Sequence, residues 1–242
     1  MKARRDFLTA GQRSNRVRPC GPAGRWMWIG ATAALALGLT GCDSTVNSSD
    51  TDKVNGSIHV AQGKPAKSVS TVNGSIHLDD NAAVTAANTV NGGIHLGAHA
   101  TATSLKTVNG SIILGPDAKV SGEASSVNGD LSLKDGAELT GRLSNVSGTI
   151  TIQAAKVDGG IDTVSGNISV TGTSHVSGGI HVGKSSGGPI HFDDTPRIVI
   201  GPGATVEGEL RFERKVELLV STRATIGPVS GATATPFAGD TP

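Results

Sequence analysis

The chain has 242 residues, of which 34 are glycine and none is tyrosine, and its aromatic content is 2%. A conventional globular core of this size would use bulkier rings, so the composition indicates a narrow interior filled by small aliphatic side chains. The formal net charge is +1, but seven of the 21 Lys and Arg and one of the 20 Asp and Glu precede Cys42. From Cys42 onward 14 cations face 19 anions, a net charge of −5. A mildly acidic body of this kind excludes a nucleic-acid-binding surface.

The segment 1–41 has the order of a secretory signal. Arginines precede an apolar run at 26–40, which is too short to cross a membrane comfortably. Leu39-Thr40-Gly41-Cys42 follows and resembles a bacterial lipobox. That resemblance implies cleavage before Cys42 and lipidation of Cys42 with acyl chains such as palmitate, and two chains on one residue hold a protein durably at a membrane. We therefore expect residues 1–41 to be a lipoprotein signal peptide and the remainder to face the periplasm from a membrane of the cell envelope.

Two shorter motifs bear on export and leave alternatives open. Asp43 resembles the signal that retains lipoproteins in the inner membrane of enteric bacteria, a rule that not all lineages follow, so inner and outer membrane both stay open. Arg4-Arg5-Asp6-Phe7-Leu8 resembles a twin-arginine motif, but a polar segment at 12–19 separates it from the apolar run. The export route and the translation start therefore stay open. After cleavage Cys42 is the sole cysteine, so no intrachain disulfide is expected.

The body of the chain is organised in hexads. Residues 42–53 are rich in Ser, Thr and Asp and predict a flexible polar tether. Beyond them every sixth residue is aliphatic, and apolar residues fall on even offsets with polar ones between, which is typical of strands. Three consecutive hexads make one turn of a three-sided coil. The aliphatic positions are Val54, Val60, Ala66, Val72, Leu78, Val84, Val90, Leu96, Ala102, Val108, Leu114 and Val120.

This period predicts an all-β fold, a single-stranded parallel β-helix with three faces over residues 54–227. We expect about nine turns and a right-handed coil, although the residues do not set the hand. Single-residue insertions after Val120 shift the frame, and each must fall at a corner because a slip inside a strand would turn its side chains to the wrong face. The period breaks near 183–197, where we expect an irregular insertion, and 228–242 predicts a disordered tail.

Like residues should stack on like, which predicts two internal columns and one corner ladder. Recurrent Asn-Gly pairs mark the corner, since both residues tolerate left-handed backbone and stacked amides can hydrogen-bond along the axis. The first column is Val54, Val72, Val90, Val108, Val127, Val146 and Val164; the second is Ile58, Ile76, Ile94, Ile112, Leu131, Ile150 and Ile168. The ladder is Asn55-Gly56, Asn73-Gly74, Asn91-Gly92, Asn109-Gly110 and Asn128-Gly129, for which we expect a structural and not a binding role.

Histidines and paired acids are the candidate chemical groups. His59, His77 and His95 should stack outward on three successive turns, and metal coordination is the weaker alternative to a polar stripe because parallel rings converge on one ion only by tilting. Asp79-Asp80 and Asp193-Asp194 are the paired acids, without the aromatic platforms that sugar-active enzymes place beside them. We expect no metal, no other cofactor and no enzymatic activity.

The repeat resembles three families. Gly201-Pro202-Gly203-Ala204-Thr205-Val206-Glu207-Gly208, with Val176-Ser177-Gly178-Gly179-Ile180, resembles bactofilins, which implies β-helices that join end to end into filaments. The Val-Asn/Ser-Gly-x-Ile core is similar to β-solenoid domains described as adhesins. The hexads also resemble acyltransferases with a catalytic histidine near an extruded loop, a role open here to His181 or His191, but an exported protein would meet no acyl donor.

These resemblances lead to one expectation and its alternatives. We expect a non-catalytic scaffold lipoprotein of the cell envelope that forms homo-oligomers or filaments. Its partners would be the membrane, through Cys42, and an envelope protein or polysaccharide, with no nucleic acid. A surface adhesin or binding module is the alternative, and a hexapeptide-type acyltransferase or polysaccharide-active enzyme is less favoured.

Overall fold

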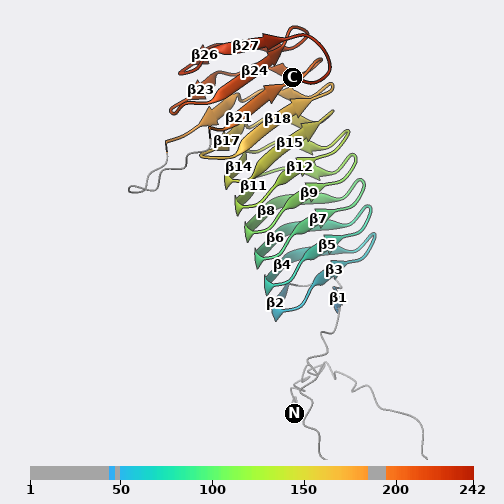
Figure 1. Ribbon diagram of the computed structural model, residues 1–242. Helices are drawn as coiled ribbons and strands as arrows, with labels where there is room; N and C mark the ends of the chain where they lie inside the picture. The colour runs from blue at the N-terminus through green and yellow to red at the C-terminus, as the bar shows by residue number, and fades with distance from the viewer. Residues whose placement is uncertain (1–43, 47–49, 185–194) are drawn as a thin grey trace, which may run out of the picture. The chain divides into compact units, whose positions relative to one another are not determined.

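The computed structural model describes residues 44–46, 50–184 and 195–242. These residues form parallel strands stacked turn upon turn, from blue at the N-terminal end to red at the C-terminal end in Figure 1. The predicted all-β solenoid, built from three hexads per turn, is therefore confirmed. The described part of the chain contains no helix of the length and apolarity that a membrane span requires. The expected signal peptide and Cys42 lie outside the described residues.

One sheet forms the first face of the solenoid and contributes one strand to each turn. Over the described residues it has 11 strands, and neighbours in the sheet come from successive turns. In order they are β1 (Ser44–Val46), β3 (Ile58–Val60), β5 (Ile76–Leu78), β7 (Ile94–Leu96), β9 (Ile112–Leu114), β12 (Leu131–Leu133), β15 (Thr149–Gln153), β18 (Asn167–Thr171), β21 (Arg197–Ile200), β24 (Glu217–Ser221) and β27 (Ala234–Phe237).

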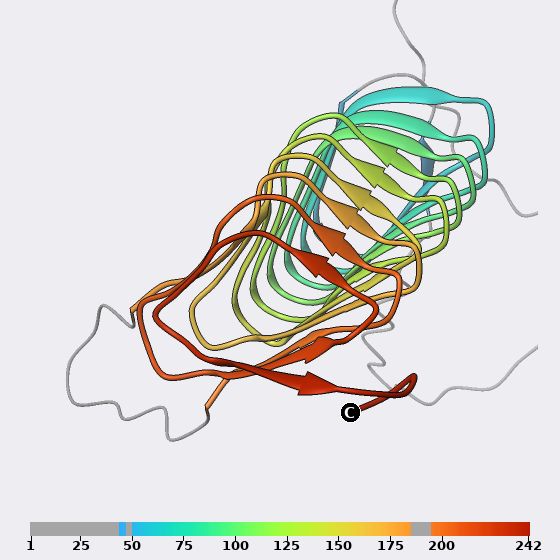
Figure 2. The same cartoon turned by 90° about the horizontal axis from the view of Figure 1, so that it is seen from above.

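The second sheet has 16 strands and folds round a corner, so it supplies the other two faces (Figure 2). Its early strands β4 (Pro65–Asn73), β6 (Ala83–Asn91) and β8 (Thr101–Asn109) run along both faces, preceded by β2 (Thr51–Asn55). Later turns divide into separate strands. The second face then holds β10 (Lys119–Val120), β13 (Glu138–Leu139), β16 (Lys156–Val157), β19 (His175–Val176), β22 (Thr205–Val206) and β25 (Thr225–Ile226). The third face holds β11 (Ala124–Asn128), β14 (Leu143–Ser147), β17 (Ile161–Thr163), β20 (Ile180–Val182), β23 (Leu210–Phe212) and β26 (Val229–Ser230).

Pairing register explains how insertions are absorbed. Ala102 pairs with Val120, whereas Leu105 pairs with Ala124, so the separation along the chain grows by one between the two pairs. The extra residue therefore lies in the corner between β10 and β11, where it leaves the inward and outward sets of both strands unchanged. The turn that contains the expected irregular insertion is longer, because Ile168 pairs with Ile198.

The interior is a narrow apolar core. The isoleucine column is buried from Ile58 to Ile168, each residue at most 1% exposed, and small alanines such as Ala82 and Ala100 fill the corners. Each turn covers the open end of its neighbour, so hydrophobic stabilisation is shared between adjacent turns.

The predicted valine column is not internal, which corrects the sequence prediction. Val72, Val90 and Val108 are 38–40% exposed. Ala66 and Val69 both point inward although they are three residues apart, so two corner residues reverse the alternation before the third face begins. The inward position is therefore the residue before each valine, namely Thr71, Thr89, Thr107, Ser126, Asn145 and Thr163.

Both ends of the solenoid extend further than predicted. The expected flexible tether at 42–53 contains β1 (Ser44–Val46) and the first three residues of β2 (Thr51–Asn55), and these strands pair with β3 and β4. Residues 228–242, expected to be a disordered tail, supply β26 and β27. The physical reason is that the edge of an existing parallel sheet offers unpaired backbone groups, so a segment of low hydrophobicity adds to it.

Candidate functional sites

The asparagines at the corner after the third face form a hydrogen-bonded ladder. Asn73 Nδ2 donates to Asn55 Oδ1 at 2.9 Å, and the same bond repeats from Asn91, Asn109 and Asn128 at 2.9–3.1 Å. The ladder ends where Ser147 donates to Asn128. The accompanying glycines allow the turns to touch, since a Cβ on Gly92 would lie 2.0 Å from the carbonyl oxygen of Gly74.

A second ladder of hydroxyl groups lies inside the same corner. Thr71, Thr89, Thr107 and Ser126 are buried, and each donates to a glycine carbonyl of the preceding corner at 3.0–3.1 Å. Asn145 takes this position in the next turn, and neither Nδ2 nor Oδ1 of its buried amide makes a hydrogen bond. The hydroxyl ladder is therefore interrupted where the asparagine ladder also ends.

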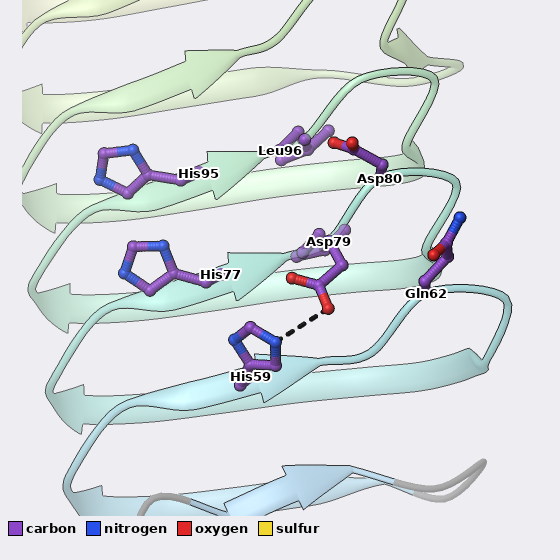
Figure 3. A pocket seen from close by; sticks show the side chains of 9 residues that line it. His59, Gln62, His77, Asp79, Asp80, His95 and Leu96 are labelled. Atoms are coloured by element: carbon purple, nitrogen blue, oxygen red, sulfur yellow. Dashed lines mark hydrogen bonds and ion pairs between the residues drawn. The ribbon is translucent and has the colours of Figure 1, made fainter.

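Three histidines line a hollow on the first face of about 490 Å³, as Figure 3 shows. His59 Nε2 lies 3.0 Å from Asp79 Oδ2, while the rings of His77 and His95 stack with centroids 4.8 Å apart and planes 9° from parallel. Burial, and then the charge of His77, lower the pKa of His95, so a neutral imidazole is favoured there. Asp80 accepts a hydrogen bond from the Ala98 amide at 2.7 Å.

This hollow brings together His59, His77 and His95 with the Asp79-Asp80 pair. The sequence prediction treated the histidines and the paired acids as separate candidate sites. Parallel stacking keeps the imidazole nitrogens side by side instead of pointing them at one centre. Within the described residues, no group of three or more His, Cys, Asp or Glu could hold a metal ion.

A charged cluster on the third face spans the turns on either side of the irregular insertion. His181 Nδ1 lies 3.2 Å from Asp162 Oδ1, and His181 Nε2 lies 3.4 Å from Glu213 Oε1. Arg142 pairs with Asp162 at 2.9 Å and Arg211 with Glu213 at 2.7 Å. The neighbouring imidazole of His181 is the largest cause of the lowered pKa of Glu213, and the charge of Arg211 adds to it.

In this cluster His181 is held between two carboxylates, with a shallow hollow of about 300 Å³ beside it. Both ring nitrogens of His181 therefore lie next to carboxylates of this cluster. His191 and Asp193-Asp194, the other candidates near the insertion, lie outside the described residues.

The fold defines the class of the protein as a parallel β-solenoid. Comparisons with protein-family models, curated proteins and solved structures find no match to this chain.

Sequence reasoning missed one surface feature, the exposed valines at the corner of the third face. Strict alternation counted back from Ile76 placed Val72 inward, but the Asn-Gly corner between them breaks the alternation. The signal available was the hydroxyl residue that recurs immediately before the valine, because a repeated Thr at an inward position accounts for the buried site.

Proposed function

We propose that the protein is a non-catalytic scaffold lipoprotein of the bacterial cell envelope, anchored through Cys42, whose bodies join end to end as bactofilins do. The observation that carries the proposal is the last turn of the solenoid. Among the residues that the structure describes, β25, β26 and β27 each have a neighbouring strand on one side only. Edge strands with unpaired N–H and C=O groups recruit further strands unless something blocks them.

The apolar interior also reaches this end without being fully covered. Ile226, Val229, Ala232 and Ala234 pack against the core but are only partly buried. A second solenoid placed on this end would bury them, as each internal turn buries its neighbour. Pro236 removes one backbone donor from β27, so the contact would depend mainly on β25 and β26.

A lysine substituted for an apolar residue at the open end of the solenoid tests this end-to-end contact. We expect the full chain, purified in detergent, to form concentration-dependent oligomers in analytical ultracentrifugation and linear particles in negative-stain microscopy. Val229→Lys should reduce these to single bodies, because a lysine there would be buried against apolar surface. Thr225→Lys is the matched control, since Thr225 is already exposed in the same turn.

Single bodies at every micromolar concentration would refute end-to-end assembly. They would favour the alternative function, a surface adhesin or binding module that presents its flat faces to an envelope partner. Acyl transfer or polysaccharide cleavage by the wild-type protein, lost in His181→Gln, would instead place it among enzymes.

A further inference from the structure

A row of exposed valines runs along the corner of the third face through six successive turns. We call this the valine row; its members are 38–68% exposed. The row follows the solenoid axis because the residue after each valine, an asparagine in five turns and Ser147 in the sixth, pairs in register with its counterpart in the neighbouring turn. With turns about 4.8 Å apart, six members extend over roughly 24 Å. The members are Val54, Val72, Val90, Val108, Val127 and Val146.

The fold itself does not require valine at these positions. The buried residue of this corner is the preceding Thr or Ser, and the asparagine ladder supplies the axial hydrogen bonds. A single exposed valine needs no explanation, but a contiguous apolar line marks an interaction surface. Beside the first three members lies an open groove of about 400 Å³, which Asp52, Ser70 and Asn88 line on the other side.

The chain covers the next valine by itself. Val164 continues the series one turn further but is half-buried, and the Arg214 guanidinium donates to its carbonyl oxygen at 3.1 Å. The uncovered part of the series is therefore confined to the turns nearer the N-terminal end.

We propose that the valine row is a lateral interface on which a second copy of this chain docks, side by side and parallel. The valines repeat at the spacing of the turns. A partner can contact all of them in the same way only if its own surface repeats at that spacing, and a second copy of this chain does. The third face contributes about five residues per strand at about 3.3 Å each, so six turns offer roughly 500 Å² per copy. Two such faces bury about 1,000 Å², which lies at the lower limit for a specific interface and predicts a weak one.

The rim of the row permits identical faces to meet. The outward residues that flank it, Ser70, Asn88, Ser125 and Ser144, are uncharged and pair in register along the face. Two positions in this column are charged: Lys106, which is neutralised by an ion pair with Glu123, and the exposed Asp52 in the first turn, which pairs in register with Ser70. An apolar centre with a polar rim of few charges is the usual anatomy of a protein interface.

The parallel orientation rests on the proposed function. Copies anchored through Cys42 in one membrane have their N-terminal ends on the same side, so a two-fold axis parallel to the solenoids places each valine against its own counterpart. Anchoring also raises the effective concentration, so a weak lateral contact is sufficient.

Cysteine cross-linking tests both the contact and its orientation. Val72→Cys and Val108→Cys, made one at a time in the full chain, should each give disulfide-linked dimers in membranes treated with a mild oxidant. Disulfides form only when the two Cα atoms are within about 7 Å, so both positions cross-link only in a parallel pair in register. Thr101→Cys is the matched control, since Thr101 is exposed on the second face of the same turn as Val108. We expect at least an order of magnitude more dimer at the valine positions than in this control.

Three results would overturn the proposal. One is no dimer above the Thr101→Cys control, and another is cross-linking only to a different protein. The third is dimer only when Val72→Cys and Val127→Cys chains are mixed, which would mean an antiparallel pair. Adding Val229→Lys should leave the cross-links intact, which separates this contact from the end-to-end one. With Cys42→Ser, the cross-links should persist at high concentration in solution, so failure of the anchor and failure of the interface can be distinguished.

Discussion

Replacing Asn145 by threonine should stabilise the protein. Asn145 is 5% exposed, and both polar atoms of its side chain lack a hydrogen-bond partner. In four earlier turns a Thr or Ser at the same place donates to the glycine carbonyl of the preceding corner. By the same geometry, a threonine at 145 would donate to the carbonyl of Gly129.

The magnitude follows from the groups exchanged. A buried polar group without a partner costs about 1–3 kcal/mol, and a new buried hydrogen bond contributes about 1 kcal/mol. The Asn145→Thr variant removes the unsatisfied amide and adds one hydrogen bond, so we expect the free energy of unfolding to rise by about 2–4 kcal/mol. The reverse change, Thr107→Asn, should lower it by a similar amount.

Urea denaturation followed by circular dichroism at the strand band measures the change, with the midpoint compared at equal slope. Solenoids unfold turn by turn when cooperativity is low, so hydrogen exchange of the amides in β14 and β17 should be measured alongside urea denaturation. Ser144→Thr is the control: Ser144 is the outward neighbour, and we expect a change within about 0.5 kcal/mol. An Asn145→Thr variant no more stable than wild type would refute the view that this amide is an uncompensated cost of the fold.

Three further results are expected. The pKa of His95 in the folded protein lies below its ordinary 6.5, so the stabilising contribution of the neutral ring is complete above pH 6.5 and is lost as the pH falls through the lowered pKa. The melting temperature should therefore drop on mild acidification. The drop should be smaller in His95→Gln. Gly92→Ala should cost several kcal/mol in urea denaturation, since its Cβ would overlap a neighbouring carbonyl, whereas Gly63→Ala, with open space around it, should cost about 1 kcal/mol for its left-handed backbone. A fatty-acid analogue should label the wild-type protein and not Cys42→Ser, and equal labelling of both would contradict lipidation at this residue.

The repeat predicted the parts of the fold that depend on alternation within one strand. Ile76 and Leu78 are inward with His77 between them, as period two requires. The prediction failed for Val72 because its position depends on how many residues each corner takes, and a hexad count treats every corner alike. The prediction of the two ends failed for a related reason. Composition indicated no strand at 51–53 or at Ala234–Phe237, but an edge strand of the same chain gives such segments a partner.

The candidate sites were predictable to a smaller extent. His59, His77 and His95 follow the regular period of three hexads, so their alignment was accessible from the sequence. No fixed period links the charged cluster of Asp162, His181 and Glu213. The turn between Asp162 and His181 carries one extra residue, and the turn after His181 includes the insertion.

The early turns of the solenoid are interchangeable. Ile58, Ile76 and Ile94 pair at equal intervals and carry the same corner, the same internal hydroxyl and the same axial bonds. Duplicating or deleting one such unit of three hexads would keep the stacking of the core and of the corner ladders and change the length of the molecule by a single step of about 4.8 Å. Insertion or deletion of whole repeats would thus change the distance between the two ends of the solenoid in small, equal steps without changing the packing of the interior.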